Sequence, residues 1–407
     1  MRLLFISYHF PPSRAARSLQ VGKLSKHLLR RGVELDVVTV RSEHLPAEVV
    51  DRDVEGWIRQ DGIRVVDVDS PARRGVDWLR AGLRGENFPR WWRNALAAAR
   101  QLLREAGPDR YDALVSFAMP IDSHLAGWRL KRRTSALSWV AHFSDPWADN
   151  PYMVNGGVRG LVHAAIESRL CRAADLVISV SEELTQHLMK RHGGDASRYR
   201  TLPHLFDPEQ YPDAHPPAAG PLLLRYLGGF SSRRRPDTLI NALAQARAQR
   251  ADLRSLRVEL IGSRMEDVAA RLNAIQPGLG AATGAVGYLA SLAKMRTAHA
   301  LLLVDADQEF SPYFPSKLAD YFGSLRPIIA ISPGHSCSSR LIREYGGLCF
   351  DHAEARRLAE LFARLAREGP AALPQPAAGS AARFEAARIA EQFERLVADC
   401  RRLTCRG

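Results

Sequence analysis

The sequence predicts an α/β protein made of two doubly wound domains. Short apolar runs of strand length alternate with helical patterns along most of the chain. A stretch rich in proline and alanine, 211–220, interrupts this alternation and is typical of a linker. At 407 residues the chain is also long for a single core, and it suits two domains of about 150–200 residues each.

The first residues predict the strand–helix–strand unit from which such a domain is built. Residues 2–8 are an apolar strand of the kind buried in a parallel sheet, the next helix ends at Gly32, and 33–40 are a second strand. Further strands are predicted at 63–68, at 111–117, around Trp139 and at 175–180. Since a doubly wound sheet binds ligands beyond the carboxyl ends of its strands, the polar residues that follow strands are site candidates.

The second half of the chain repeats this pattern, with strands predicted at 222–227, 256–261, 301–304 and 328–331. The turn 228–236 follows the first of them and contains two glycines and three arginines before a helix begins. Such a turn can cradle a phosphate, because backbone N–H groups and arginines converge on it. The alternative is a basic turn that is simply solvated.

The most informative stretch is 309–330, where a loop leads into a helix and then into a buried strand. Ser316 is expected to cap this helix, whose start attracts anions such as phosphate. Lys317 adds a full positive charge there, and Asp320 lies one turn further on the same face. The helix could therefore hold a phosphate while the carboxylate accepts hydrogen bonds from sugar hydroxyls. An ordinary amphipathic helix is the alternative.

This stretch resembles the donor-binding segment of family 4 glycosyltransferases, in the branch that builds bacterial surface polysaccharides. The resemblance lies in Pro315-Ser316-Lys317-Leu318-x-Asp320-Tyr321, followed by Arg326-Pro327-Ile328. It implies that Asp320 holds the ribose of the donor and that Ser316 and Lys317 face its diphosphate. The family usually has a second acid eight residues earlier, but Pro312 stands at that position here, and Glu309 is the nearest acid upstream.

The opening of the chain also resembles the family, since Phe10-Pro11-Pro12 leads into the loop that usually binds the acceptor. Ser13–Arg17 stands where glycines are usual, which makes a close approach of backbone to ligand less favourable. The positive charges of Arg14 and Arg17 in this loop suit an anionic acceptor. Two solvated arginines are the alternative.

The residues after the strand around Trp139 carry a further match. Asp145, Pro146 and Trp147 agree with the family, while His142 and Ser144 replace an acid and an arginine. In related transferases this loop faces the reacting carbon of the sugar, so Asp145, and after it His142, are the catalytic candidates. A helix cap or turn is the alternative role for Asp145.

The remaining donor residues follow from the resemblance alone. A basic residue of the turn 228–236 should contact the diphosphate, and Arg234 or Arg235 is that residue. Gly229, Gly262 and Tyr288 are expected to line the same donor site.

The resemblance also implies the GT-B architecture, in which two Rossmann-like domains face each other across a cleft. The expected domains are 1–210 for the acceptor and 221–385 for the donor, with a C-terminal helix, 386–407, that crosses back to the first domain.

Composition restricts the partners and the compartment. The net charge of +13 suits nucleic acid, an anionic membrane or phosphorylated substrates, but the arginines are dispersed rather than gathered in one block, which disfavours nucleic acid. Five cysteines without metal-ligand spacing indicate reduced thiols in a cytoplasm. The aromatic and basic residues from Trp78 to Trp92 could dock on the inner face of a membrane, or form a packed helix whose arginines lie along its surface.

The function expected is sugar transfer from a nucleotide diphosphate sugar to a saccharide or lipid-linked acceptor. The family implies retention at the anomeric carbon, no cofactor and no metal; Asp305-Ala-Asp307 is the one candidate for a metal-binding carboxylate pair. A nucleotide-sugar epimerase of the same fold and a non-catalytic relative that binds sugar nucleotides are the alternatives.

Overall fold

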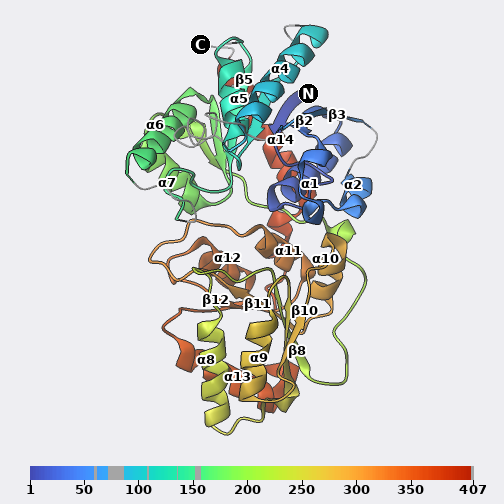
Figure 1. Cartoon of the computed structure of the whole chain (residues 1–407), viewed down its shortest axis with the longest axis vertical. Helices are drawn as coiled ribbons and strands as arrows, with labels where there is room; N and C mark the ends of the chain where they lie inside the picture. Colours follow the sequence, from blue (N-terminus) through green and yellow to red (C-terminus); the bar gives the residue numbers. More distant parts are fainter. Residues whose placement is uncertain (59–61, 72–86, 108–109, 135, 152–156, 405–407) are drawn as a thin grey trace. The chain divides into compact units, whose positions relative to one another are not determined.

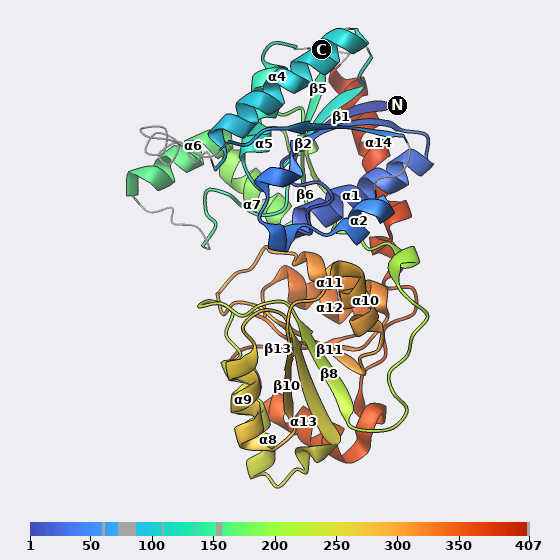
Figure 2. The same ribbon diagram turned by 45° about the vertical axis from the view of Figure 1, so that its right-hand side comes forward.

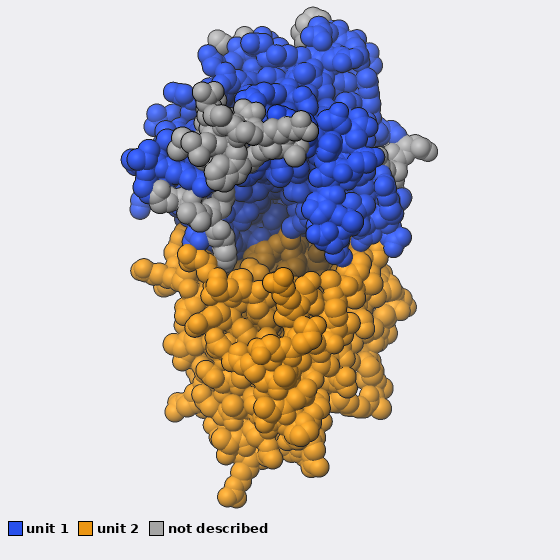
Figure 3. All heavy atoms as spheres, in the orientation of Figure 1, with its two compact units in different colours: residues 1–205, 312–314, 386–407 blue, residues 206–311, 315–385 orange. Residues whose placement is uncertain are grey.

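The computed structural model describes residues 1–58, 62–71, 87–107, 110–134, 136–151 and 157–404. The chain divides into two compact units, coloured separately in Figure 3. The first unit contains Met1–Leu205, Pro312–Phe314 and Ala386–Gly407. The second contains Phe206–Ser311 and Pro315–Glu385. Each unit is built around its own parallel sheet, so the predicted pair of Rossmann-like α/β domains is confirmed.

The described part of the first unit has a seven-stranded sheet in the order β3-β2-β1-β4-β5-β6-β7, with every neighbouring pair parallel. Its strands are β1 (Arg2–Ser7), β2 (Glu34–Val40), β3 (Ile63–Val68), β4 (Ala113–Phe117), β5 (Ser138–Phe143), β6 (Leu176–Ser179) and β7 (Tyr199–Thr201). The central strands are apolar because both faces of the sheet are covered by helices. The short edge strand β7 has too few apolar residues to be predicted from the sequence.

The α-helices in the described part of the first unit are α1 (Ala16–Arg30), α2 (Arg52–Ile58), α4 (Pro89–Ala106), α5 (Asp122–Lys131), α6 (Gly157–Ala173), α7 (Glu182–His192) and α14 (Ala386–Thr404). Ser181 caps α7 by accepting a hydrogen bond from the Leu184 N–H. Helix α4 packs against α5, and the C-terminal helix α14 packs against α1 (Figures 1 and 2). The predicted return of the C-terminal helix to the first domain is therefore confirmed.

The described part of the second unit has a six-stranded parallel sheet in the order β10-β9-β8-β11-β12-β13. Its strands are β8 (Leu222–Leu227), β9 (Leu256–Ile261), β10 (Gly280–Thr283), β11 (Ala300–Val304), β12 (Ile328–Ile331) and β13 (Leu348–Phe350). Its helices are α8 (Asp237–Ala248), α9 (Glu266–Ile275), α10 (Tyr288–Arg296), α11 (Ser316–Ser324), α12 (Cys337–Tyr345) and α13 (Ala355–Glu368). Its core consists of aliphatic side chains from the strands and from α8, α9 and α13.

Both sheets reverse their strand order at one point, between β1 and β4 in the first unit and between β8 and β11 in the second. Ligands of doubly wound sheets bind at such points, beyond the carboxyl ends of the strands. The residues that follow these strands are therefore where a site is expected in each unit.

The boundary between the units falls between Leu205 and Phe206, shortly before the end of the expected first domain, 1–210. The three residues Pro312–Phe314 group with the first unit, although both neighbouring segments belong to the second. Among the described residues, no helix combines the length and the apolar character that a membrane span requires. Trp78 lies outside the described residues.

Candidate active site

Two glycine turns meet at the reversal point of the second unit. Gly228 follows β8 with φ +129°, and Gly262 follows β9 with φ +156°. A Cβ atom at Gly262 would lie 1.9 Å from the Gly228 carbonyl oxygen, so a side chain here would collide with backbone. The predicted donor residue Gly229 accepts a hydrogen bond from the Tyr226 hydroxyl at 3.0 Å. These turns leave bare backbone facing the start of α11.

Lys317 lies beside these turns. Its Nζ donates to the Leu227 carbonyl oxygen at 3.0 Å and lies 4.4 Å from the centre of the Tyr226 ring. Burial, together with the nearby charge of Arg234, lowers the pKa of Lys317 to about 7, and Asp305 offsets part of this. Because this pKa is close to neutral pH, a bound anion would shift Lys317 fully to its protonated, charged form.

The start of α11 differs from the prediction in one respect. Ser316 is the first residue of the helix, and Pro315 occupies the capping position without a side-chain cap. The expected Ser316 cap is therefore wrong, because proline fixes the backbone angle that leads into the helix one residue earlier. Lys317 still lies in the first turn of α11, as predicted.

The structure distinguishes the two arginines that the sequence left open. Arg234 is half-buried, close enough to lower the pKa of Lys317, and its Nε has no partner in the described part of the chain. The Arg235 side chain is 69% exposed and pairs with Asp237 at 3.2 Å. Arg234, and not Arg235, thus joins Lys317 at the carboxyl end of β8.

Asp320 and Tyr288 are the two donor candidates that the structure joins directly. The Tyr288 hydroxyl donates to Asp320 Oδ1 at 2.9 Å, and the Tyr211 hydroxyl donates to the Asp320 carbonyl oxygen at 2.8 Å. Burial, and then the charge of Asp320, raise the pKa of Tyr288 well above its usual value. The tyrosine therefore stays protonated and fixes the carboxylate on the face of α11 turned to α10.

The carboxylates of Asp305 and Asp307 are not held together. Asp305 is buried after β11 and accepts a hydrogen bond from the Ser332 hydroxyl at 2.8 Å, whereas Asp307 is exposed. Two carboxylates that converge on one ion would share one environment. Asp305 instead acts as the acidic neighbour of Lys317.

In the first unit, Arg17 and His142 meet at the carboxyl end of β5. Arg17 Nη1 lies 3.2 Å from His142 Nδ1. Because a guanidinium can only donate, Nδ1 must be the acceptor, and the imidazole proton sits on Nε2. Burial and the charge of Arg17 lower the pKa of His142 well below its usual value, so the ring is neutral. The predicted acceptor residue and a predicted catalytic residue therefore share one cluster.

Arg17 retains unused hydrogen-bonding capacity. Its side chain is buried, and neither Nε nor Nη2 has a partner among the residues described. Burial lowers its pKa to about 10, and Asp145 offsets part of this. Arg14, its predicted companion, is half-buried and donates its backbone N–H to the Val49 carbonyl oxygen at 2.8 Å. The side chain turned inward to the cluster is Arg17.

Asp145 completes this cluster. Burial raises its pKa, although the Ser144 hydroxyl at 2.9 Å and the charge of Arg17 act in the opposite direction. His204 also belongs to this environment, and burial, followed by the charge of Arg17, holds its pKa well below the usual value. The arrangement combines one buried cation, one carboxyl group and neutral imidazoles.

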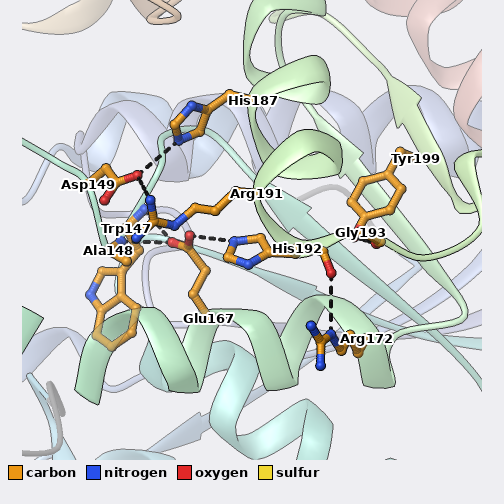
Figure 4. Close-up of polar contacts among 10 residues, drawn as sticks. All are labelled: Trp147, Ala148, Asp149, Glu167, Arg172, His187, Arg191, His192, Gly193 and Tyr199. Atoms are coloured by element: carbon orange, nitrogen blue, oxygen red, sulfur yellow. Dashed lines mark hydrogen bonds and ion pairs between the residues drawn. The ribbon is translucent and has the colours of Figure 1, made fainter. Parts of the chain in front are cut away.

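The loop that carries Asp145 is held by a buried carboxylate that no sequence pattern indicated. Glu167 of α6 accepts hydrogen bonds from the backbone N–H groups of Trp147 and Ala148, at 2.7 and 2.8 Å (Figure 4). Its other oxygen lies 2.8 Å from Nε2 of His192, at the end of α7. Both side chains are almost completely buried. A buried acid can be recognised only when its partners, 19 to 25 residues away, are known.

The loop before α11 is anchored in the first unit. The Ser181 hydroxyl donates to the Pro312 carbonyl oxygen at 2.6 Å, and the ring of Phe314 lies 5.3 Å from that of His204. Pro312 replaces the first acid of the family pattern, so at this position a backbone carbonyl forms the observed contact.

Comparison with known proteins agrees with this geometry. Residues 18–204 match the model of the glycosyl transferase 4-like domain. No curated protein matches the chain.

Solved structures share the fold across both units. HepE from Anabaena, in complex with UDP, is 15% identical with a TM-score of 0.66, and the match covers 98% of this chain and all of that one. The lipopolysaccharide outer core galactosyltransferase WaaB is 14% identical with a TM-score of 0.65, covering 98% and 99%. A variant of TarM from S. aureus, in complex with UDP among other ligands, is 9% identical with a TM-score of 0.63, covering 98% and 100%.

At these identities the solved structures establish the fold, and the domain match identifies residues 18–204 as glycosyl transferase 4-like. The expected GT-B class is confirmed. The chain thus combines a glycosyl transferase 4-like domain over residues 18–204 with the GT-B fold.

Proposed function

We propose that this enzyme transfers a sugar from a nucleoside diphosphate sugar to a saccharide or lipid-linked acceptor, in the synthesis of a surface polysaccharide or glycolipid. The observation that carries the proposal is the pair of cationic side chains, Lys317 and Arg234, beside two glycine turns at the start of α11. A diphosphate has the charge that such a site neutralises, and the start of a helix adds a partial positive charge.

The donor we propose is a uridine diphosphate sugar, because the solved structures of HepE and the TarM variant contain UDP. Asp320, oriented by Tyr288, would accept hydrogen bonds from the ribose. Gly229 and Gly262 would let the nucleotide approach the backbone closely.

We propose transfer with retention and without a metal. Charge that develops on the leaving diphosphate would be met by Lys317, Arg234 and the first N–H groups of α11. The raised pKa of Asp145 brings its proton exchange nearer to neutral pH, where proton transfer is most effective. His142, with its proton on Nε2, is a second donor beside it. Arg17 would bind an anionic group of the acceptor through Nε and Nη2.

An acceptor that is linked to a lipid places the reaction at a membrane surface. We propose that the protein works in the cytoplasm, on the inner face of the membrane, with the donor supplied from solution. The net charge of +13 supports attraction to an anionic surface.

Calorimetric titration of UDP-, GDP-, ADP- and dTDP-sugars tests the donor. We expect the uridine compounds to bind, and a ligand at about 100 times its Kd to stabilise the protein by about 2.7 kcal/mol. Proton NMR of the first product should show the anomeric configuration of the donor, and added EDTA should leave the rate unchanged.

Three outcomes would contradict the proposal. Conversion of the donor to its epimer without any acceptor would identify an epimerase. Donor binding without turnover on any acceptor would identify a non-catalytic relative. If none of the four donor classes binds, the donor site proposed in the second unit is wrong.

A further inference from the structure

A groove of about 740 Å³ lies in the first unit on helices α4, α5 and α6, away from the carboxyl ends of the strands. Helix α4 contributes Trp92, Arg93 and Arg100 to its lining. Figures 1 and 2 show α4 and α5 side by side in this part of the unit. Neither the proposed donor site nor the Arg17 cluster uses any of these residues.

The charged residues among the described lining of this groove are all cationic. Arg129 of α5, Arg133 just after this helix and Arg169 of α6 join the two arginines of α4, and no carboxylate is found among the described lining residues. In the described chain, none of these five arginines forms an ion pair, whereas arginines elsewhere do so repeatedly, as Arg191 does with Asp149. Five cations without a counter-ion form a site for an anion.

The arginines also act on one another. Burial lowers the pKa of Arg100, and the charges of Arg133 and Arg104 lower it further. Arg100 Nε and Trp92 Nε1 are buried without a partner in the described residues. Two buried donors beside repelling cations would gain hydrogen bonds from a bound phosphate.

The floor of the groove is apolar, in contrast to its basic rim. Leu96, Leu125 and Leu170 line it and are buried. Trp128 lies between floor and rim, with the guanidinium groups of Arg129 and Arg169 at 4.9 and 5.9 Å from its ring centre. Aliphatic side chains below a rim of tryptophan and arginine are typical of a surface that meets a lipid headgroup together with the start of its acyl chains.

We infer that this groove binds the headgroup of an anionic phospholipid and so docks the enzyme on the membrane. The inference rests on the proposed function in one respect: a lipid-linked acceptor requires the enzyme at a membrane. Free phosphate shares the charge chemistry but leaves the leucine floor unused. Nucleic acid would use the arginines and tryptophans but requires a continuous basic track, and the groove is confined to three helices.

Co-sedimentation with lipid vesicles tests the inference on the full-length chain. The parent protein should bind vesicles that contain phosphatidylglycerol, and should not bind vesicles of phosphatidylcholine alone. The groove variant Arg100→Gln/Arg129→Gln/Arg133→Gln should bind the anionic vesicles about 100-fold more weakly, as expected from about a fivefold loss per basic residue. The control variant Arg247→Gln/Arg356→Gln/Arg367→Gln makes the same charge change at exposed positions of the second unit and should bind like the parent.

Further measurements distinguish a failure of the lipid site from a failure of the proposed donor site. Calorimetric titration with UDP should give the same Kd for parent, groove variant and control, which shows that the donor site is intact. Equal binding of parent and groove variant to anionic vesicles, or equal loss in the control, would overturn the inference. Tighter binding of the groove to inorganic phosphate or to a DNA duplex than to anionic vesicles would also overturn it. If the parent binds these vesicles but no donor, the proposed function fails and the lipid site stands.

Discussion

The two units place cations at equivalent ends of similar sheets but hold them in different ways. In the second unit, Lys317 and Arg234 come from short segments that directly follow a strand or begin a helix. In the first unit, Arg17, His142 and Asp145 are gathered from distant parts of the chain and are buried among one another. A site built from local segments tolerates the loss of one side chain, whereas a site built from a buried cluster depends on its supports.

The largest effect is expected at the support of the first-unit cluster. Replacement of Glu167 by alanine removes a buried carboxylate and leaves two backbone N–H groups and His192 without their acceptor. We expect the free energy of unfolding to fall by about 3–5 kcal/mol, measured by chemical denaturation. The partly exposed carboxylate of Asp149, which pairs with Arg191, provides the control, and Asp149→Ala should cost about 1 kcal/mol at most. Equal losses in both variants would show that burial does not distinguish this carboxylate.

The next effect separates catalysis from binding. Asp145→Asn keeps the size of the side chain and an oxygen that can accept the Ser144 hydrogen bond, but cannot exchange a proton. We expect kcat to fall about 100-fold, which corresponds to about 2.7 kcal/mol, with an unchanged Kd for UDP. Steady-state kinetics and calorimetry check both values. If Asp145→Asn unfolds at a markedly lower temperature than the parent, the residue is structural and its catalytic role is wrong.

A smaller effect is expected at Lys317 of the second unit, and we expect it in donor binding rather than in kcat. Lys317→Met removes one charge-assisted bond of about 1.5–3 kcal/mol, so the Kd for UDP should rise about 10- to 100-fold, with little change for uridine. Arg235→Met is the matched control, because Arg235 is exposed and pairs only with Asp237 among the described residues. Calorimetry on both variants decides the matter. A Lys317→Met protein that binds UDP like the parent would remove α11 from the donor site.

The pH dependence of donor binding sharpens the same point. In the free protein the pKa of Lys317 is lowered to about 7, so the lysine is charged below pH 7 and loses its proton above it. A bound diphosphate favours the charged form, so UDP affinity should fall above pH 7, by about tenfold (1.4 kcal/mol) per pH unit at most. In Lys317→Arg the guanidinium stays charged, and its affinity should not show this fall. Parallel pH profiles for the two proteins would contradict the assignment.

The smallest effect concerns the backbone at the end of α11. Leu325 adopts a left-handed conformation, with φ 56° and ψ 34°, and is 54% exposed. Leu325→Gly should therefore stabilise the second unit by about 1 kcal/mol, seen as a higher denaturant midpoint. Leu325→Ala keeps the Cβ atom and should give no such gain. A lower midpoint for the glycine variant would show that its greater freedom in the unfolded state dominates.

The sequence was sufficient for the fold because the central strands of both sheets are mostly apolar. The edge strands β7, β10 and β13 were missed, since they are only three or four residues long, and β7 and β10 also contain polar residues or glycine. The position of Lys317 before Asp320 on one helix could be read directly, because helical spacing places them.

The cluster of the first unit was only partly predictable. The sequence selected Arg17, His142 and Asp145 separately, but nothing in it indicated that Arg17 bonds to His142, 125 residues away. Glu167 and His192 were not selected at all, because a buried pair of hydrogen-bonded side chains has no local sequence pattern. The choice between Arg234 and Arg235 also needed the structure, since adjacent residues of a turn differ only in the direction of their side chains.

The C-terminal helix α14 has a consequence for the order in which the protein is made. Its residue Phe393 packs edge-on against Phe5 of β1, and Glu394 bonds to Arg31 at 2.6 Å, so a helix synthesised after the second unit completes the first unit. Most of the second unit is one stretch of chain and can fold while synthesis continues. The first unit remains without one of its helices until α14 has been synthesised. A nascent chain that stalls before residue 386 would thus expose apolar side chains of β1 and α1, and a quality-control protease could recognise it before any complete enzyme exists.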